Sequence, residues 1–140
     1  LKDLNATVAY LKTAPEVDPA KIVVMGFCMG GGYALMLPCV NRDLKAAVPF
    51  YGPVPNPDTP LQNLACPILY IYGEEDGWTT KADVQRLANA LKKYNKPGEI
   101  KTYPGASHAF FNDTRSEVYK AAESKDAWGR AFSFFRQHLG

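Results

Sequence analysis

The chain has 140 residues, of which 46% are hydrophobic and 21% are charged, and its formal net charge at pH 7 is +2. This length and composition are typical of one globular core, so we expect residues 1–140 to form a single domain. The nearly balanced charge and the lack of a basic stripe interleaved with aromatic residues argue against a nucleic-acid partner. No apolar run has the length of a membrane span and no signal-peptide pattern is present, so we expect a cytoplasmic protein without a membrane partner.

The first half of the chain predicts two helices and two strands. Apolar residues at helical spacing over Leu1–Thr13 predict a helix that ends before Pro15. The apolar run Ile22–Met25 is too short for a helix and predicts a buried strand. A buried helix is expected from there to about Val40, and a second buried strand over Leu44–Tyr51.

The second half begins with Gly52–Pro60, which contains four prolines and predicts an irregular surface loop. The next strand, Pro67–Tyr72, is nearly continuous in apolar residues, as a parallel sheet requires. Thr79 or Thr80 can cap the helix that follows. The apolar face expected for that helix consists of Val84, Leu87, Ala88, Leu91 and Tyr94.

A short strand, Glu99–Tyr103, precedes the last predicted helix. The segment Thr114–Glu117, with the sequence TRSE, fits a capping box that would begin this helix. We expect the helix to run to about His138, with a core-facing side made of Ala121, Trp128, Ala131, Phe132 and Phe135.

This order of elements predicts an α/β fold with a four-stranded parallel sheet and helices on its faces, because parallel strands need crossover connections. In such sheets, binding and catalytic groups gather beyond the carboxyl ends of the strands. Three loops are expected at that edge. They contain Cys28 after the first strand, Asp76 after the third and His108 after the fourth.

The segment Gly26-Phe27-Cys28-Met29-Gly30 joins the first strand to its helix. A glycine two residues before and two residues after Cys28 lets the chain reverse tightly and holds one side chain at the apex. This is the G-x-S-x-G pattern of a nucleophile elbow, with cysteine in place of serine. The beginning of the helix directs unpaired N–H groups and a positive dipole end at the sulfur, which favours a thiolate nucleophile.

Three other interpretations of the glycine-rich segment need comparison. A dinucleotide-binding turn would have a glycine where Cys28 stands and an acidic residue at the end of the next strand, which instead ends in Pro49-Phe50-Tyr51-Gly52. A P-loop would contain Gly-Lys-Ser/Thr, which is absent. A purely structural role for Cys28 remains an open alternative.

The chain has three cysteines, and their spacing matches neither metal-ligand nor redox pairs. We therefore expect reduced thiols, and no metal or cofactor. Cys39 and Cys66 fall in predicted buried elements and are expected to be small core residues.

A thiol nucleophile needs a base, and the base needs an orienting acceptor. Of the two histidines, His108 directly follows the fourth strand, whereas His138 lies at the end of the last helix. His108 is therefore the candidate base, and a solvated loop histidine is the alternative. Asp76 comes latest in its turn and is the candidate orienter, with Glu74 and Glu75 expected to face solvent. The order nucleophile, acid, histidine is that of the α/β-hydrolases.

The chain as a whole resembles the dienelactone hydrolase family of the α/β-hydrolase fold. The resemblance rests on the following segments: Gly26–Gly31, Phe50–Gly52, Pro67–Leu69 with Gly73 and Asp76, Gly105–Phe110, and a tail with Arg115, Tyr119, Ala121, Ala122, Trp128, Arg130, Phe134 and Phe135. It implies a Cys28–His108–Asp76 triad that hydrolyses lactones or carboxylic esters through an acyl-cysteine. The strands and helices that precede the matching segment in the family are not within these residues, so the expected fold is a short, minimal form.

The resemblance also implies differences in the substrate site. The family's second oxyanion-hole loop belongs to the preceding elements, so we expect the Met29 backbone N–H to stabilise the oxyanion and turnover to favour good leaving groups. Family members that act on dienelactones carry an arginine where this chain has Asn112. Phe27, Trp78, Phe110 and Phe111 flank the three loops, and we expect them to form an apolar pocket for the small-molecule ester or lactone, with ordinary core packing as the alternative.

The first strand would be internal in the full family fold and is expected to be an open edge here. Open edges promote association, so we expect a homo-oligomer, most simply a dimer. A general carboxylesterase or thioesterase, and a non-catalytic fragment of the family, are the alternative functions.

Overall fold

The computed structural model describes all of residues 1–140, and the predicted order of strands and α-helices is confirmed. None of the helices is both long and apolar enough to span a membrane. The elements are α1 (Lys2–Leu11), β1 (Ile22–Phe27), α2 (Met29–Val40), β2 (Leu44–Phe50), the short 3-10 helix η1 (Thr59–Asn63), β3 (Ile68–Gly73), α3 (Lys81–Lys93), β4 (Gly98–Tyr103) and α4 (Ala121–Leu139).

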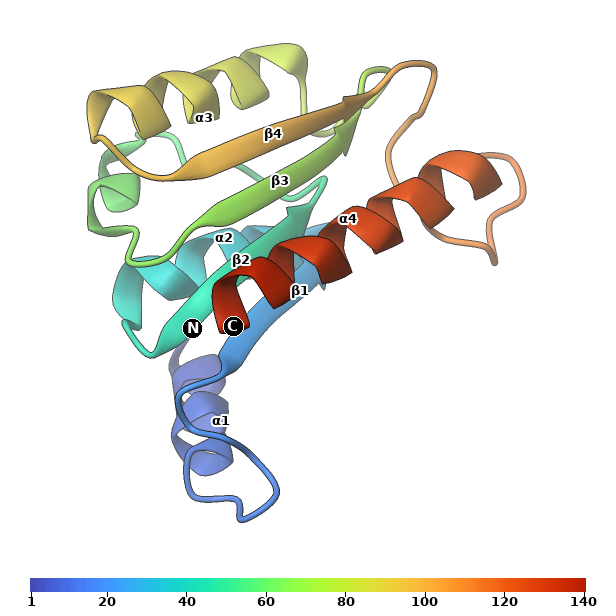
Figure 1. The fold of residues 1–140 in the computed structure, drawn as a ribbon. Coiled ribbons are helices and arrows are strands. Elements are labelled where there is room, and N and C mark those ends of the chain that lie inside the picture. Colours follow the sequence, from blue (N-terminus) through green and yellow to red (C-terminus); the bar gives the residue numbers. More distant parts are fainter.

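The four strands form one parallel sheet in the order β1-β2-β3-β4, as predicted. All six residues of β3 are buried, and Lys45 is the one exposed residue of β2, because helices cover both faces of the central strands. Figure 1 shows α4 in front of the sheet and α2 and α3 behind it. The carboxyl ends of all four strands therefore meet at one edge.

The loop between β2 and β3 is irregular up to Asp58, as predicted for Gly52–Pro60, although Gly52 and Val54 in this part are buried. Its second part forms η1, and Leu61 and Leu64 are almost fully buried in the core. Prolines break regular structure, but they do not prevent nearby leucines from joining the core, and η1 packs against α2 and α3. The loop therefore contributes to the core that supports the site.

The predicted capping box at Thr114 is wrong, because α4 begins at Ala121. The Thr114 hydroxyl donates to Asn112 Oδ1 at 2.7 Å, and Glu117 pairs with Arg115 at 3.1 Å. These short polar side chains find partners within their own turn, so they are not available to cap a helix. Lys120, the residue before the helix, donates its N–H to the carbonyl of Phe110 at 2.9 Å, and the helix begins at the next residue.

The predicted core face of α4 is only partly correct. Ala131 and Phe135 are buried as expected, but Trp128 and Phe132 are each 42% exposed and Ala121 is exposed. The apolar residues of α4 cover more than one helical stripe, and the sheet buries the stripe that crosses β2 and β3. That stripe consists of Ser124, Ala127, Ala131, Phe134 and Phe135.

The α3 helix follows its prediction closely. Thr80 is the N-cap, and its hydroxyl and the Asp83 carboxylate form a capping box. Val84, Leu87 and Leu91 are buried as expected, and Ala90 is buried in place of the half-exposed Ala88.

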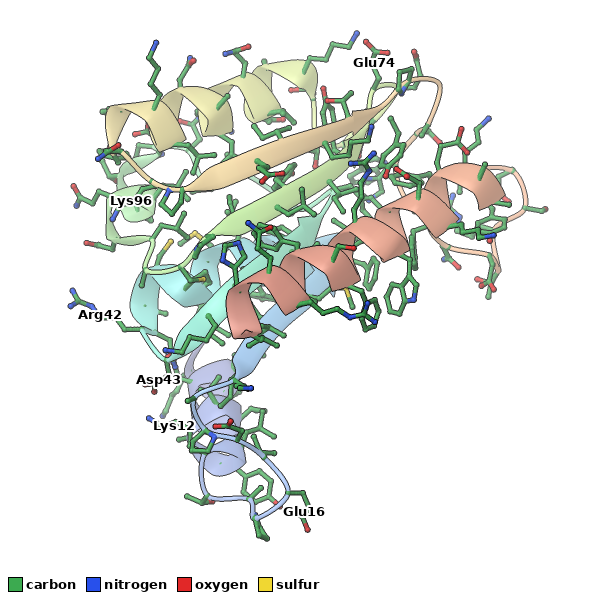
Figure 2. The ribbon with its side chains drawn as sticks, viewed as in Figure 1. Lys12, Glu16, Arg42, Asp43, Glu74 and Lys96 are labelled. Carbon is green, nitrogen blue, oxygen red and sulfur yellow. The ribbon has the colours of Figure 1, made fainter.

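The α1 helix lies beside the amino end of β1 and buries one side chain, Val8. Asn41 Nδ2 donates to Asn5 Oδ1 at 2.8 Å, and Lys12 pairs with Asp43 at 2.8 Å (Figure 2). The ion pair is solvent-exposed, so it contributes on the order of 0–1 kcal/mol. At the other end of the helix Leu1, the residue that precedes α1, lines a cavity together with Met29 and Tyr33 of α2.

The turn from β1 into α2 depends on a close backbone contact at Gly26. A Cβ atom at this position would lie 2.0 Å from the carbonyl oxygen of Gly30, which belongs to the first turn of α2. A Cβ atom at Gly30 itself would meet no atom within 4 Å. Position 26 therefore requires glycine for steric reasons, whereas position 30 does not.

We expect Gly26→Ala to lower the free energy of unfolding by about 1–3 kcal/mol, because the added methyl group must displace backbone atoms. The matched variant Gly30→Ala should be as stable as the parent chain or more stable by up to about 1 kcal/mol, since alanine loses less conformational entropy in a helix. Urea unfolding followed by circular dichroism measures both. Equal stabilities for the two variants would contradict this steric account.

Candidate active site

Cys28 lies at the turn between β1 and α2, with φ 55° and ψ −118° and an exposed thiol. A positive φ is uncommon for a residue with a side chain and is maintained only where the surroundings enforce it. Here the Cys28 N–H donates to the carbonyl of Phe50 at 3.0 Å, and its own carbonyl accepts from Gly32 N–H at 3.1 Å. The sheet on one side and the helix on the other thus hold the residue in this conformation.

His108 follows β4 and lies between Cys28 and Asp76. Its Nε2 atom is 3.0 Å from Cys28 Sγ, and its Nδ1 atom is 2.8 Å from Asp76 Oδ2. The side chain of His108 is 15% exposed and that of Asp76 is fully buried. The structure therefore brings together three side chains that are separated by up to 80 residues in the sequence.

The turn after β3 holds the Asp76 carboxylate in place. Asp76 Oδ1 accepts hydrogen bonds from the backbone N–H groups of Trp78 at 2.7 Å and Thr79 at 2.9 Å. The other oxygen, Oδ2, is left to face His108. Of the neighbouring acidic residues, Glu74 pairs with Lys81 at 3.1 Å and Glu75 is exposed.

The turn after β3 and the loop after β4 are also packed directly against each other. A Cβ atom at Gly73 would lie 2.3 Å from the carbonyl oxygen of Ala106, so the two backbones approach more closely than any other residue would allow. Ala106 also accepts a hydrogen bond from Glu75 N–H at 2.9 Å. This contact sets the position of His108 relative to Asp76.

Met29 is the first residue of α2, and its side chain is 68% exposed. The N–H groups of the first helical turn have no acceptor within the helix. The backbone N–H of Met29 is therefore available beside Cys28, together with the positive end of the helix dipole.

A cleft of about 360 Å³ opens at Cys28. Phe27 and Phe111, two of the four predicted pocket residues, line it. Trp78 does not line this cleft, although its ring, 84% exposed, lies 6.0 Å from that of His108. Phe110 does not line it either, because its side chain is fully buried beneath Tyr51 and against Tyr103. The remaining lining residues are Cys28, Tyr51, Ala109, Asn112 and Asp113.

Tyr51 lines the cleft although it was not among the predicted site residues. Its ring is 5.0 Å from that of His108 in an edge-on arrangement, and its carbonyl accepts from the Thr79 hydroxyl at 3.2 Å. Burial raises the pKa of the Tyr51 phenol well above its ordinary value, and negative charge at Cys28 and Asp76 raises the pKa further. The phenol is therefore neutral and can donate a hydrogen bond. The position of Tyr51 in the sequence, directly after β2 and before Gly52, was the signal that could have identified it as a site residue.

The other candidate groups lie away from the cleft. Cys39 and Cys66 are buried in the core as predicted. His138 stacks edge-on against Phe134 at the end of α4, with 4.5 Å between the rings. No group of three or more histidine, cysteine or acidic side chains is arranged to hold a metal ion.

Comparison with known proteins identifies the family of this chain. The family described as the dienelactone hydrolase family matches residues 1–139. The chain belongs to the dienelactone hydrolase family. Among curated relatives of this family, the "Putative carboxymethylenebutenolidase" of Saccharolobus solfataricus is 45% identical over 84% of this chain and 44% of that protein. Protein usf of Aquifex pyrophilus is 33% identical over 96% of this chain and 59% of that protein. The chain thus spans about half the length of these relatives.

Solved structures of dienelactone hydrolase relatives show the same fold. The "Putative Dienelactone Hydrolase" of Klebsiella pneumoniae superposes with a TM-score of 0.90 at 30% identity, over 96% of this chain and 59% of that one. The dienelactone hydrolase-like promiscuous phosphotriesterase P91, from metagenomic libraries, superposes with a TM-score of 0.88 at 22% identity, over 97% of this chain and 60% of that one. At that lower identity the likeness concerns the fold alone.

The three thiols of this family member are expected to differ sharply in reactivity. Burial raises the pKa of Cys39 to about 11 and that of Cys66 to about 12, so both remain neutral thiols near neutral pH. Only the thiolate is nucleophilic, and Cys28 alone is exposed. We expect iodoacetamide at pH about 8 to modify Cys28 and no other cysteine of the folded chain.

Mass spectrometry of the intact chain should then show one added group, and peptide mapping should place it on Cys28. The Cys28→Ser variant should remain unmodified under the same conditions, and all remaining thiols should react after unfolding in urea. Modification of Cys39 or Cys66 in the folded chain would contradict the burial described here.

Proposed function

We propose that this chain hydrolyses carboxylic esters or lactones through an acyl-cysteine on Cys28. The line of contacts from Cys28 Sγ through His108 to the Asp76 carboxylate supports the proposal most strongly. A nucleophile, a base within hydrogen-bond distance and a buried orienting carboxylate are the groups that acyl transfer requires. Membership of a hydrolase family points to the same class of reaction.

In the first half of the proposed reaction, His108 Nε2 holds the proton released by the Cys28 thiol. The thiolate attacks the ester carbonyl carbon, a C–S bond forms, and the π electrons move to the carbonyl oxygen. That oxyanion accepts a hydrogen bond from Met29 N–H. When the intermediate collapses, the C–O bond to the alcohol breaks and His108 gives its proton to the departing oxygen. A thioester then remains on Cys28.

In the second half, His108 takes a proton from a water molecule that attacks the thioester carbonyl. The new tetrahedral intermediate collapses with cleavage of the C–S bond, which releases the carboxylic acid and restores the Cys28–His108 pair. Throughout both halves Asp76 holds the imidazole orientation and stabilises its protonated form.

The charge of the cleft bears on substrate choice. Asp113 is the one charged side chain that lines it. The family resemblance implies that members acting on dienelactones carry an arginine where this chain has Asn112. Among residues 1–140, no cationic side chain lines the cleft to pair with a carboxylate next to the reacting carbonyl, and Asp113 would oppose it. We therefore propose neutral esters and lactones as substrates, which favours a general carboxylesterase over an enzyme restricted to anionic lactones.

Hydrolysis of p-nitrophenyl acetate tests the proposed mechanism. We expect Cys28→Ala to abolish turnover and the acetylated intermediate seen by rapid-quench mass spectrometry. We expect His108→Ala to lower kcat/KM by about 100- to 10,000-fold, because proton transfer is lost. Asp76→Asn should lower it by about 100-fold or more, since an amide cannot stabilise the imidazolium.

Matched controls use residues of the same type outside the line of contacts. His138→Ala should leave kcat/KM unchanged, and so should Glu75→Gln, which alters the neighbouring acidic residue of the same turn. Activity that survives in Cys28→Ala would overturn the proposal. Absence of activity in the parent chain would favour the alternative of a non-catalytic member of the family.

We also propose that copies of the 140-residue chain associate along β1. Within residues 1–140 this strand has no neighbour on its outer side, and its sequence IVVMGF contains no charge and no proline to discourage pairing. Phe27 at its end is 36% exposed. We expect light scattering at micromolar concentration to give about twice the 15.4 kDa of one chain. A monomer at that concentration would contradict this proposal.

A further inference from the structure

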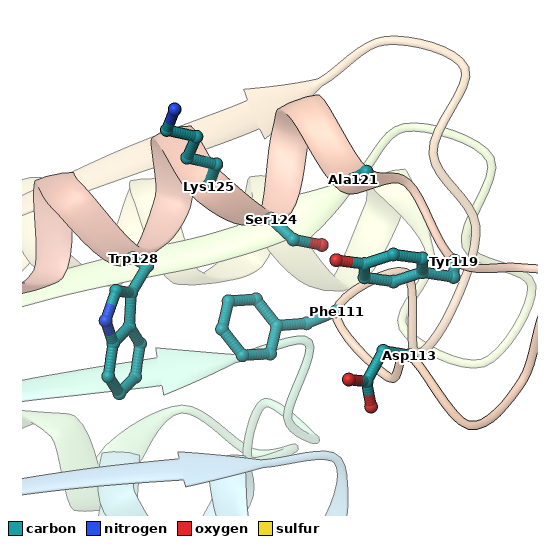
Figure 3. Close-up of a pocket in the computed structure, with 7 residues that line it drawn as sticks. All are labelled: Phe111, Asp113, Tyr119, Ala121, Ser124, Lys125 and Trp128. Atoms are coloured by element: carbon teal, nitrogen blue, oxygen red, sulfur yellow. The ribbon is translucent and has the colours of Figure 1, made fainter.

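A second cavity lies beside the Cys28 cleft, between the loop that follows His108 and the first turns of α4. Its volume is about 350 Å³. Figure 3 shows Phe111 at its centre, with Trp128 on one side and Tyr119 and Ser124 on the other. The reaction proposed above uses none of these four residues for chemistry.

The second cavity adjoins the cleft. Phe111 and Asp113 line both of them. The ring of Phe111 stacks on Phe27 at 5.1 Å on the side of Cys28, and its centre is 5.8 Å from the ring of Trp128 on the other side. A ligand that occupies both spaces would have its carbonyl at Cys28 and would pass Phe111, the wall that the two spaces share.

The walls of this cavity suit a flat aromatic group. Phe111, Tyr119 and Trp128 present three rings, and Tyr119 and Trp128 are 36% and 42% exposed. Aromatic rings bind other rings at centroid distances of about 4.5–7 Å, so a phenyl group can contact two of these walls at once. The exposed ring surface is what such a ligand would cover.

The polar groups of the cavity point to a neutral ligand. The hydroxyl of Ser124, a residue only 5% exposed, donates to the carbonyl of Phe110 at 3.1 Å, so its lone pairs are left to accept. The Tyr119 hydroxyl points toward it (Figure 3). Lys125 and Asp113, the two charged residues that line the cavity, are both exposed, and the Lys125 amine points away from the ring of Phe111 (Figure 3). A phenyl ring, with or without a hydroxyl group, fits this arrangement better than an ion.

We propose that this second cavity binds the aromatic part of the acyl group of an ester substrate, with a short linker between the ring and the carbonyl. The assignment of the linked carbonyl to Cys28 rests on the function proposed above, but binding of the ring does not. The substrate class is thereby narrowed to neutral esters of arylalkanoic acids.

Binding is tested without catalysis. The chain has two tryptophans, so Cys28→Ser combined with Trp78→Phe leaves Trp128 as the single fluorescent reporter. Titration with 3-phenylpropionamide should change its emission saturably, whereas propionamide should not.

Adding Tyr119→Ala should weaken binding of the phenyl amide by about 10-fold, as loss of one stacked wall implies. Phe132→Ala should leave the affinity unchanged, since Phe132 contacts Trp128 but does not line the cavity. Equal effects of the two variants, or no saturable change, would overturn the proposal.

Turnover tests whether the bound ring belongs to a substrate. Vinyl esters are suitable because their leaving group is not aromatic and cannot occupy the cavity itself. We expect Trp128→Ala to lower kcat/KM for vinyl 3-phenylpropionate by about 10-fold, mainly through KM, and to leave that for vinyl propionate unchanged. Phe132, which is equally exposed on the same helix, provides the matched control, and Phe132→Ala should alter neither constant.

The two measurements separate the two proposals. Saturable binding of the phenyl amide in a chain that hydrolyses no ester would overturn the proposed function and leave the aromatic site standing. Ester hydrolysis with equal losses for both vinyl esters in Trp128→Ala would assign Trp128 a structural role and overturn the aromatic site alone.

Discussion

The position of the Cys28 sulfur depends on one steric constraint, the contact between Gly26 of β1 and the carbonyl of Gly30 in α2. Because position 26 has no Cβ atom, the first turn of α2 can pack closely against β1, the strand that precedes it. The chain then has room for one residue at the turn, and that residue takes a positive φ with its side chain directed outward. The same contact places the free N–H groups of the first helical turn beside the sulfur.

The opposite half of the site uses a second close backbone contact. Gly73 at the end of β3 lies against the carbonyl of Ala106, and this joins the turn that contains Asp76 to the loop that contains His108. A fully buried carboxylate is costly unless hydrogen bonds satisfy it. Two backbone N–H groups satisfy one oxygen of Asp76, and the ring of His108 satisfies the other. The imidazole is therefore held at both nitrogens, at Nδ1 by Asp76 and at Nε2 by Cys28 Sγ.

An aromatic layer connects this site to α4. The rings of Phe27, Phe111 and Trp128 follow one another at 5.1 and 5.8 Å, so the apolar surface continues from the nucleophile turn to the last helix. Trp128 and Phe132 are exposed on α4, where the sequence pattern predicted core residues. Of these two exposed rings, that of Trp128 lines the second cavity and that of Phe132 does not.

The sequence by itself determined the parallel sheet, because short apolar runs separated by helical patterns allow few other arrangements. It also singled out Cys28, Asp76 and His108, since each is a reactive residue type directly after its own strand. The start of α4, its buried stripe, the core leucines of η1, the place of Tyr51 and the second cavity were decided only by the tertiary structure. Each of these depends on contacts between segments distant in the chain: Thr114 is occupied within its turn, and the crossing of α4 over β2 and β3 selects which apolar residues are covered. Local sequence patterns carry no information about such contacts. Several helical stripes and several loop positions are equally compatible with the same local pattern.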